Sequence, residues 1–254
     1  MHAFTSSTLA VHSISNFSLL RQPTSQSDSA ESFHQPKATN LHAASSLLRP
    51  LIAQIEKRQS SSLLLVLQGM DAAGKDSAIR SMLKSMGNLK IRTESFRQPN
   101  VDELQHDFLW RIHHKAPRVG EWVIFNRSHY EDVLIARVRG GIDRKTLDKR
   151  IQHILNFESL LIDHQVIVVK CFLHINKEEQ QIRLQSRMDD PAKHGKLDLA
   201  DLEDRAHWDD YMKAYDEALI KTSTPLAPWH VIPSDHKLER DLNLLNILLQ
   251  RLTN

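Results

Sequence analysis

The chain has 254 residues, with 33 Lys or Arg, 31 Asp or Glu and a formal net charge of +2. This length suits one domain with a sizeable core, and the near-balance of charge argues against bulk nucleic-acid binding, although local basic clusters could still hold a polyanion. The single cysteine, Cys171, excludes an internal disulfide framework and a cysteine-based zinc site. Because no apolar run approaches the ~20 residues that span a bilayer, we expect a cytoplasmic protein without a membrane segment.

The first 40 residues are rich in serine and poor in charge. Such a segment cannot bury enough apolar surface to offset the ordering of the chain. A transit peptide needs an arginine-rich amphipathic helix, and this stretch holds only Arg21 and Lys37. We therefore predict a flexible N-terminal arm over residues 1–40, followed by one domain over residues 41–254.

Beyond residue 40, apolar segments of strand length alternate with amphipathic helical stretches. The run LLLVLQ at 63–68 is typical of a strand covered on both faces in a parallel sheet. The expected strands are 63–68, 90–95, 121–125, 166–173 and 229–232, and after a first helix around 47–58 the expected helices are 75–86, 102–115, 129–138, 144–164, 176–188, 202–221 and 238–252. This alternation predicts an α/β fold with a mostly parallel sheet and right-handed crossovers.

The segment 187–206 interrupts the alternation. It is dense in charge and contains Pro191 and Gly195. One interpretation is a solvated loop between two helices, since long loops are only sometimes functional. The other is a mobile lid that closes over a charged substrate.

The strongest chemical motif follows the first core strand. The string GMDAAGKDS at 69–77 matches G-x-x-x-x-G-K and lies between an apolar strand and an amphipathic helix, as a phosphate-binding loop requires. Glycines allow the loop to wrap around a phosphate, while successive N–H groups and the helix N-terminus bind the anion. A chance Gly-Lys turn is the alternative. The expected phosphate-binding residues of this loop are Gly69, Ala72, Ala73, Gly74, Lys75, Asp76 and Ser77.

The loop departs from the ordinary motif in two places. Asp76 stands where a Ser or Thr hydroxyl usually ligates Mg²⁺. Asp71 adds a carboxylate inside the loop, where it would crowd the phosphates unless it binds a metal ion that bridges to them. We therefore expect Asp71 to replace part of the missing hydroxyl ligand.

A second polar cluster follows the strand 121–125. In open α/β sheets, ligands bind at the carboxyl ends of the strands, so this cluster should face the same crevice as the loop. Most phosphate-loop proteins have an Asp here that holds Mg²⁺, whereas this chain has Asn126, with Glu131 and Asp132 one turn further on. Arg127 can pair with phosphate oxygens in bidentate fashion. The alternative is an ordinary polar helix N-terminus, where acidic residues are favoured.

Together these strings resemble the polyphosphate kinase 2 family. The resemblance includes GMDAAGKD at 69–76, HDFLWRIH at 106–113, IFNRSHYEDVLIARV at 124–138, NFESLL at 156–161, FLHINKEEQ at 172–180, WDDYMKAYDEAL at 208–219 and TSTPLAPWHVIPSDHK at 222–237. It covers about residues 41–254. The string NRSHYEDV is similar to that of the subgroup associated with phosphorylation of both AMP and ADP.

The resemblance implies a P-loop kinase fold, thymidylate-kinase-like, with a helical lid at about 187–206 and inorganic polyphosphate as the phosphoryl donor. It implies AMP, ADP and other nucleoside mono- and diphosphates as acceptors, no nucleic-acid or membrane partner, and a homo-oligomer, either a dimer or a tetramer. The implied cofactor is Mg²⁺, with Mn²⁺ as an alternative, held by Asp71 and Glu131.

The family's functional residues map onto this chain position by position. The implied catalytic residues are Asp71, Lys75, Arg127 and Glu131. The strand-end carboxylate of the family falls on Asn126, which weakens a metal-binding role there. The implied phosphate-binding residues of the lid are Arg183, Arg187, Lys193 and Lys196. The lid departs from the family pattern at Gly195, where an aromatic residue is usual.

Two other functions remain open from the sequence. An ATP-dependent nucleoside monophosphate kinase would share the fold, although such kinases usually have a hydroxyl after the loop lysine rather than Asp76. A non-catalytic nucleotide- or polyphosphate-binding regulator is the third reading. The presence of Asp71, Lys75 and Arg127 argues against it.

Overall fold

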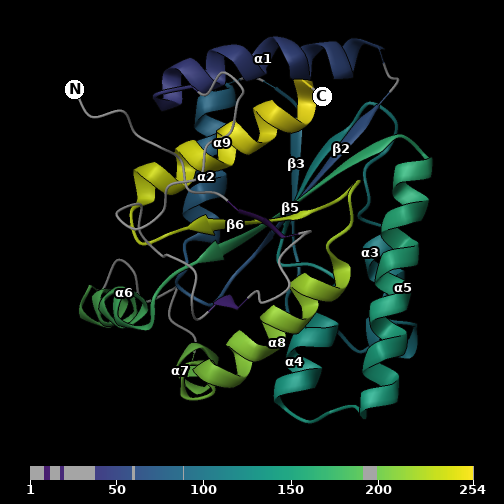
Figure 1. Cartoon of the computed structure of the whole chain (residues 1–254), viewed down its shortest axis with the longest axis vertical. Coiled ribbons are helices and arrows are strands. Elements are labelled where there is room, and N and C mark those ends of the chain that lie inside the picture. Colours follow the sequence, from purple (N-terminus) through teal and green to yellow (C-terminus); the bar gives the residue numbers. More distant parts are fainter. Residues whose placement is uncertain are drawn as a thin grey trace.

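The computed structural model describes residues 9–11, 18–19, 38–58, 61–87, 89–190 and 199–253. Its centre is a six-stranded sheet with the order β1-β6-β5-β2-β4-β3 (Figure 1). The five strands that pair in parallel are β2 (Ser62–Gln68), β3 (Ile91–Ser95), β4 (Trp122–Asn126), β5 (Val166–His174) and β6 (Trp229–Pro233). The predicted α/β fold and mostly parallel sheet are therefore confirmed.

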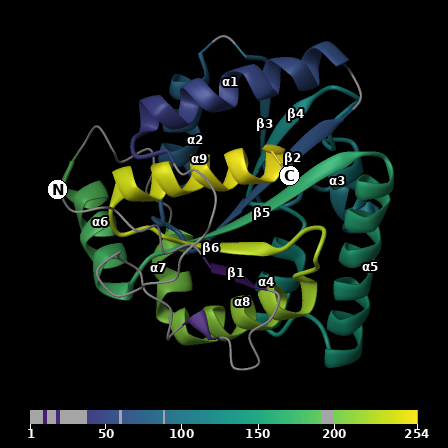
Figure 2. The ribbon, with the colours of Figure 1, turned by 45° about the horizontal axis from the view of Figure 1, so that its top comes forward.

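The larger helices cover the two faces of this sheet. One group consists of α1 (Leu41–Arg58), α2 (Lys75–Met86) and α9 (Lys237–Thr253), which contact one another. The other consists of α4 (Glu131–Val138), α5 (Arg144–Asp163) and α8 (Trp208–Thr222) (Figures 1 and 2). Helices α6 (Lys177–Asp189) and α7 (Leu199–Ala206) lie together at one end of the molecule. Within the described ranges, no helix is long and apolar enough to cross a membrane.

The apolar strand β2 lies at the centre because both of its faces are covered. All seven of its residues are buried, and its Leu65 pairs with Ile124 of β4 and Val169 of β5. The register also pairs Leu67 with Asn126. As a result, the loop that follows β2 and the polar residues that follow β4 emerge side by side.

Two predicted helices have a different form. The region 102–115 contains only a 3₁₀ turn, Glu103–Gln105, and the short helix α3, Trp110–His113. The single helix predicted there is wrong, because Asp107 accepts a hydrogen bond from the backbone N–H of Leu109 (2.9 Å) and starts a new turn.

The predicted helix 202–221 is two helices, α7 and α8, that meet at His207. Helix α7 is held against α6, since Arg205 donates hydrogen bonds to the carbonyl oxygen of Lys177 (2.7 Å) and to Gln180 (2.9 Å). These contacts between α7 and α6 set the direction of α7. They are tertiary contacts, which the helical periodicity of the sequence cannot predict.

Parts of the N-terminal arm contact the domain. Strand β1 (Leu9–Val11) pairs antiparallel with β6. The backbone N–H of Leu19, a buried residue, donates to Asp216 (2.6 Å), and that of Ala38 donates to Asn246 (3.0 Å). The sequence did not predict these contacts because no local pattern marks a three-residue edge strand. Most other residues of the arm lie outside the described ranges, and the division at residue 40 stays a prediction.

Candidate active site

The loop between β2 and α2 has the backbone conformation that its two glycines permit. Gly69 has φ +149° and Gly74 has φ +104°. A Cβ atom on Gly69 would lie 2.7 Å from the carbonyl oxygen of Leu173, and one on Gly74 would meet the guanidinium tip of Arg240. The loop therefore needs glycine at both positions for conformation, and at Gly69 also for space, because a backbone carbonyl lies where its Cβ atom would be.

Lys75 lies under this loop. Its Nζ donates to the carbonyl oxygens of Gly69 (2.7 Å) and Met70 (3.2 Å), and the side chain is buried. Burial, and then the positive charge of Arg127, lower the pKa of Lys75, while Asp71 raises it. The ammonium group of Lys75 is therefore already positioned at the loop. When phosphate binds, Nζ can replace a hydrogen bond to a carbonyl oxygen with one to a phosphate oxygen.

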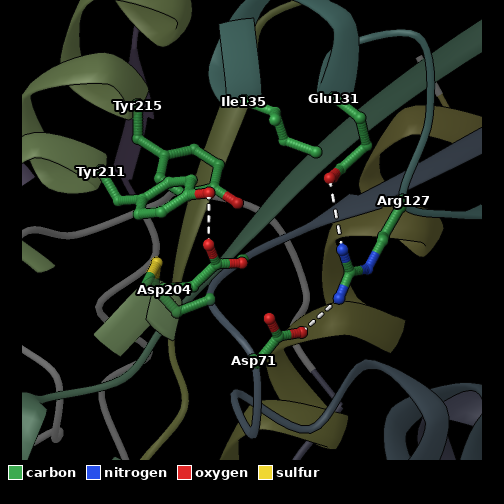
Figure 3. Close-up of a pocket in the computed structure, with 9 residues that line it drawn as sticks. Asp71, Arg127, Glu131, Ile135, Asp204, Tyr211 and Tyr215 are labelled. Atoms are coloured by element: carbon green, nitrogen blue, oxygen red, sulfur yellow. Dashed lines mark hydrogen bonds and ion pairs between the residues drawn. The ribbon is translucent and has the colours of Figure 1, made fainter. Parts of the chain in front are cut away.

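Arg127 connects the two parts of the site. Its guanidinium forms an ion pair with Asp71 of the loop and another with Glu131, where Nη1 lies 3.3 Å from Oε2 (Figure 3). Its backbone has φ +61°, an uncommon conformation for a residue other than glycine. The predicted catalytic residues Asp71, Arg127 and Glu131 thus meet at one point.

The two carboxylates that Arg127 contacts, Asp71 and Glu131, have pKa values shifted in opposite directions. Burial acts to raise the pKa of Asp71, but Lys75 and Arg127 together hold it below its usual value. Burial raises the pKa of Glu131 despite the same two cations. Although burial alone would lower the pKa of Arg127, the charges of Glu131 and Asp71 raise it. Asp71 is therefore the carboxylate that the site most strongly holds as an anion.

A pocket with about 270 Å³ of empty space, open to solvent, adjoins these residues. Helices α7 and α8 supply its other wall through Asp204, Tyr211 and Tyr215 (Figure 3). The hydroxyl of Tyr211 donates to Asp204 (2.7 Å). The sequence analysis missed these three residues; the i, i+4 spacing of the tyrosines on one helix was the available signal. The complete lining is Gly69, Met70, Asp71, Arg127, Glu131, Ile135, Asp204, Tyr211 and Tyr215.

Side chains of helix α6 hold the loop by donating hydrogen bonds to the loop's backbone carbonyl oxygens. Arg183 donates to the carbonyl oxygens of Ala72 (3.1 Å) and Ala73 (3.2 Å), and also to those of Ser234 (2.8 Å) and Asp235 (2.7 Å). Gln180, which the sequence analysis did not single out, donates to the carbonyl oxygen of Asp71 (2.9 Å). In this structure Arg183 positions the loop, and a direct contact between Arg183 and phosphate stays a prediction.

Arg187 connects α6 to α7. Its Nη1 lies 3.0 Å from Oδ2 of Asp201, the first acidic residue of α7. Burial, followed by the charge of Asp71, raises the pKa of Asp201 to about 7. Helix α7 thus brings a carboxylate close to the loop. The predicted lid residues Lys193 and Lys196, together with Gly195, lie outside the described residues.

The outer end of the loop contains another pair of predicted residues. The amide Nδ2 of Asn126 donates to Oδ1 of Asp76 (2.6 Å). Ser77 turns inward, and its hydroxyl donates to the carbonyl oxygen of Gly74 (2.8 Å). Across the described part of the chain, no three His, Cys, Asp or Glu side chains are grouped so as to hold a metal ion by themselves. A cation here would also need oxygen atoms from phosphate or water.

A phosphate-binding loop after a buried parallel strand, with Lys75 beneath it and Arg127 at the next strand end, defines a P-loop protein built for phosphoryl transfer. The sequence model described as "Polyphosphate kinase 2 (PPK2)" matches residues 32–254. The chain belongs to the polyphosphate kinase 2 family, which confirms the resemblance drawn from its motifs.

Individual relatives agree with this assignment. The chain is 43% identical over 232 residues to an AMP/ADP-polyphosphate phosphotransferase of Meiothermus ruber, with 89% of this chain and 85% of the relative covered. It is 39% identical to an ADP-polyphosphate phosphotransferase of Rhodopseudomonas palustris, with 83% and 75% covered. The solved structure of polyphosphate kinase 2 from Arthrobacter aurescens TC1 matches with a TM-score of 0.87 and 38% identity, covering 96% of this chain and 87% of that one.

Proposed function

We propose that this protein transfers a phosphoryl group from inorganic polyphosphate to AMP and to ADP, giving ADP and ATP, and that it catalyses the reverse reaction at the same site. The observation that carries the proposal is the convergence of Asp71, Lys75 and Arg127 around one phosphate-binding loop. The names of the relatives from Meiothermus ruber and Rhodopseudomonas palustris support polyphosphate as donor and AMP and ADP as acceptors.

The residues of the loop act by binding and charge neutralisation. Phosphoryl transfer passes through a loose transition state, so catalysis consists of positioning and electrostatic stabilisation. The backbone N–H groups of the loop and the N-terminus of α2 bind the donor chain. Lys75 and Arg127 hold the oxygens of the terminal phosphoryl group, and Arg187 stabilises charge on its equatorial oxygens. The attacking phosphate oxygen of the acceptor is already ionised, so the site needs no strong general base.

Kinases of this family generally depend on a divalent metal ion, and the site suits Mg²⁺ or Mn²⁺. Its donor atoms are carboxylate and amide oxygens, which are the ligands that Mg²⁺ prefers. Asp71 and Glu131 would hold the ion, and Arg127, which now pairs with both, would turn to phosphate. When bound, the ion neutralises charge on the donor and acceptor phosphates.

The remaining properties belong to the same proposal. We expect Lys193 and Lys196 to contact the polyphosphate chain when the lid closes, and other nucleoside mono- and diphosphates to be accepted as well. We expect a cytoplasmic homo-oligomer, a dimer or a tetramer, without nucleic-acid partners. Light scattering after gel filtration measures the oligomer, and a monomeric mass would contradict this expectation.

One experiment tests the function. Purified protein with Mg²⁺ and AMP is incubated with either long-chain polyphosphate or ATP, and the nucleotides are then separated. We expect ADP and then ATP from polyphosphate. ADP formed only from ATP would indicate an ATP-dependent nucleoside monophosphate kinase instead, and no product from either donor would indicate a binding protein without activity.

A further inference from the structure

Two tyrosines of α8 face the pocket from the wall opposite the phosphate loop. Tyr211 and Tyr215 are four residues apart, so they lie on the same face of the helix, and each is only 4% exposed. They line the pocket together with the predicted catalytic residues Asp71, Arg127 and Glu131 (Figure 3). Their hydroxyl groups are therefore candidates to contact a molecule that occupies the pocket.

The hydroxyl of Tyr211 already has a partner within the protein. It donates to Oδ1 of Asp204 (2.7 Å), and the same oxygen accepts a hydrogen bond from Arg139 (3.0 Å). These bonds join α8 to α7 and to the end of α4. Tyr211 therefore supports the arrangement of the helices around the pocket.

The hydroxyl of Tyr215 has no such partner. Within the described part of the chain it forms no hydrogen bond, although its ring packs against Phe172 with 4.6 Å between the ring centroids. Figure 3 shows this hydroxyl on the side of the pocket that faces Asp71 and Arg127. A buried hydroxyl without a partner is unfavourable, because its lost hydrogen bonds to water are not replaced. An acceptor atom on a molecule in the pocket would supply the missing partner.

The surroundings of this hydroxyl make it a hydrogen-bond donor. Burial, followed by the negative charge of Glu131, raises the pKa of Tyr215 well above its usual value, and Arg127 only partly opposes this shift. The hydroxyl therefore keeps its proton. Since Lys75 and Arg127 attract anions to this end of the loop, the acceptor that fits best is a phosphate oxygen.

We propose that Tyr215 is a further substrate-binding residue, whose hydroxyl donates a hydrogen bond to an oxygen of the terminal phosphoryl group that Lys75 and Arg127 hold. The two cations approach this group from the loop and from the end of β4, whereas Tyr215 approaches it from α8. The equatorial oxygens, which carry the charge of a loose transition state, then have donors on both walls of the pocket. This inference rests on the proposed function, because that function places a phosphoryl group at Arg127.

Tyr215→Phe tests the inference, since it removes the hydroxyl and keeps the ring. Tripolyphosphate with Mg²⁺ is titrated into the full-length proteins without nucleotide, and binding is followed by calorimetry. We expect Tyr215→Phe to lose about 10- to 100-fold in affinity, the range for a hydrogen bond to a charged group, and a similar factor in kcat/KM with AMP. Its Tm without ligand should stay within about 2 °C of the parent, because the hydroxyl has no partner to lose.

Tyr211→Phe is the matched comparison, because it removes the hydroxyl that does have a partner. It breaks the bond to Asp204 and should lower Tm by about 2–4 °C. Thr253→Val removes an exposed hydroxyl from the end of α9, on the opposite face of the sheet from α8 (Figure 1). This variant should have parental affinity and Tm.

Several results would overturn the inference. Parental tripolyphosphate affinity in Tyr215→Phe would do so, as would a parent without saturable tripolyphosphate binding. A loss of affinity with a fall in Tm as large as that of Tyr211→Phe would indicate a structural role instead. A loss confined to the binding of AMP would place the hydroxyl on the acceptor rather than on the donor.

Failure of the proposed function gives a different result. A parent protein that forms no ADP or ATP from polyphosphate would refute that function. The tripolyphosphate titration would still decide whether Tyr215 contacts phosphate, so the two failures are distinguishable.

Discussion

Removal of the Lys170 side chain tests how a buried charge supports the site. Lys170 lies in β5 with no solvent exposure, and its Nζ donates to Glu158 (2.6 Å) and to the carbonyl oxygen of Thr222 (2.7 Å). Glu158 is also buried and accepts a hydrogen bond from the hydroxyl of Tyr130 (2.7 Å), which belongs to the turn before α4. Lys170→Met keeps the approximate volume of the side chain and removes its charge.

We expect this change to cost about 3–5 kcal/mol in the free energy of unfolding, because it leaves a buried carboxylate without its cation. For a chain of this size, the loss corresponds to a fall of about 10 °C in Tm. Burial acts to raise the pKa of Glu158, and Lys170 is the main group that lowers it. Without Lys170, burial raises that pKa, so the stabilisation from protonated Glu158 is present at low pH and is lost as pH rises. The deficit should therefore shrink as pH falls from about 7 toward 5.

Urea denaturation followed by tryptophan fluorescence measures this effect. Trp229 is a suitable reporter because its ring lies 5.4 Å from Nζ of Lys170. The double variant Lys170→Met/Glu158→Gln should recover a large part of the loss, since no unpaired charge then remains. Lys145→Met, at an exposed lysine of α5, should have nearly the parental stability. A deficit below about 1 kcal/mol, or one that does not depend on pH, would refute the reasoning.

Three further predictions concern the loop and its surroundings. Gly74→Ala should cost about 1–3 kcal/mol in unfolding free energy and most of the activity, because φ is +104°, a conformation that residues with a Cβ atom rarely adopt; denaturation and kinase assays check both, and a neutral substitution would contradict the geometry. Arg183→Lys should raise KM for polyphosphate and lower Tm, since a lysine cannot bridge the loop carbonyls to those of Ser234 and Asp235; steady-state kinetics and thermal scans measure this, and parental values for both would disprove the positioning role. The thiol of Cys171 is buried and burial raises its pKa, so a thiol reagent at about pH 8 should react only after unfolding; rapid reaction with the native protein would contradict its placement.

The parts of the site that the sequence predicted depend on local patterns. An apolar strand, a Gly-rich loop and an amphipathic helix follow one another at 63–86, so each supports the interpretation of the next. The convergence with Arg127 and Glu131 followed from one further rule, that adjacent parallel strands place their carboxyl ends at one edge of the sheet. That rule needed no knowledge of side-chain packing.

The parts that the sequence did not predict depend on contacts between distant segments. The contact between Arg183 and phosphate stays a prediction, but Arg183 donates hydrogen bonds to backbone carbonyls around residues 72 and 235, and no local pattern in the sequence indicated these hydrogen bonds. The same is true of the helix predicted at 202–221, which divides because α7 binds α6 through Arg205. A helical pattern records which face of a segment is apolar, but it does not record which other element that face meets.

The central claim is that polyphosphate is the phosphoryl donor, and the transfer of labelled phosphoryl groups from polyphosphate to AMP tests it most directly. Protein, Mg²⁺, AMP and radiolabelled polyphosphate are combined without any ATP, and the nucleotides are separated over time. We predict label first in ADP and then in ATP, and no labelled nucleotide with Asp71→Asn or Lys75→Ala, although both variants remain folded. Unlabelled nucleotides with the parent protein, or undiminished labelling with either variant, would contradict the account.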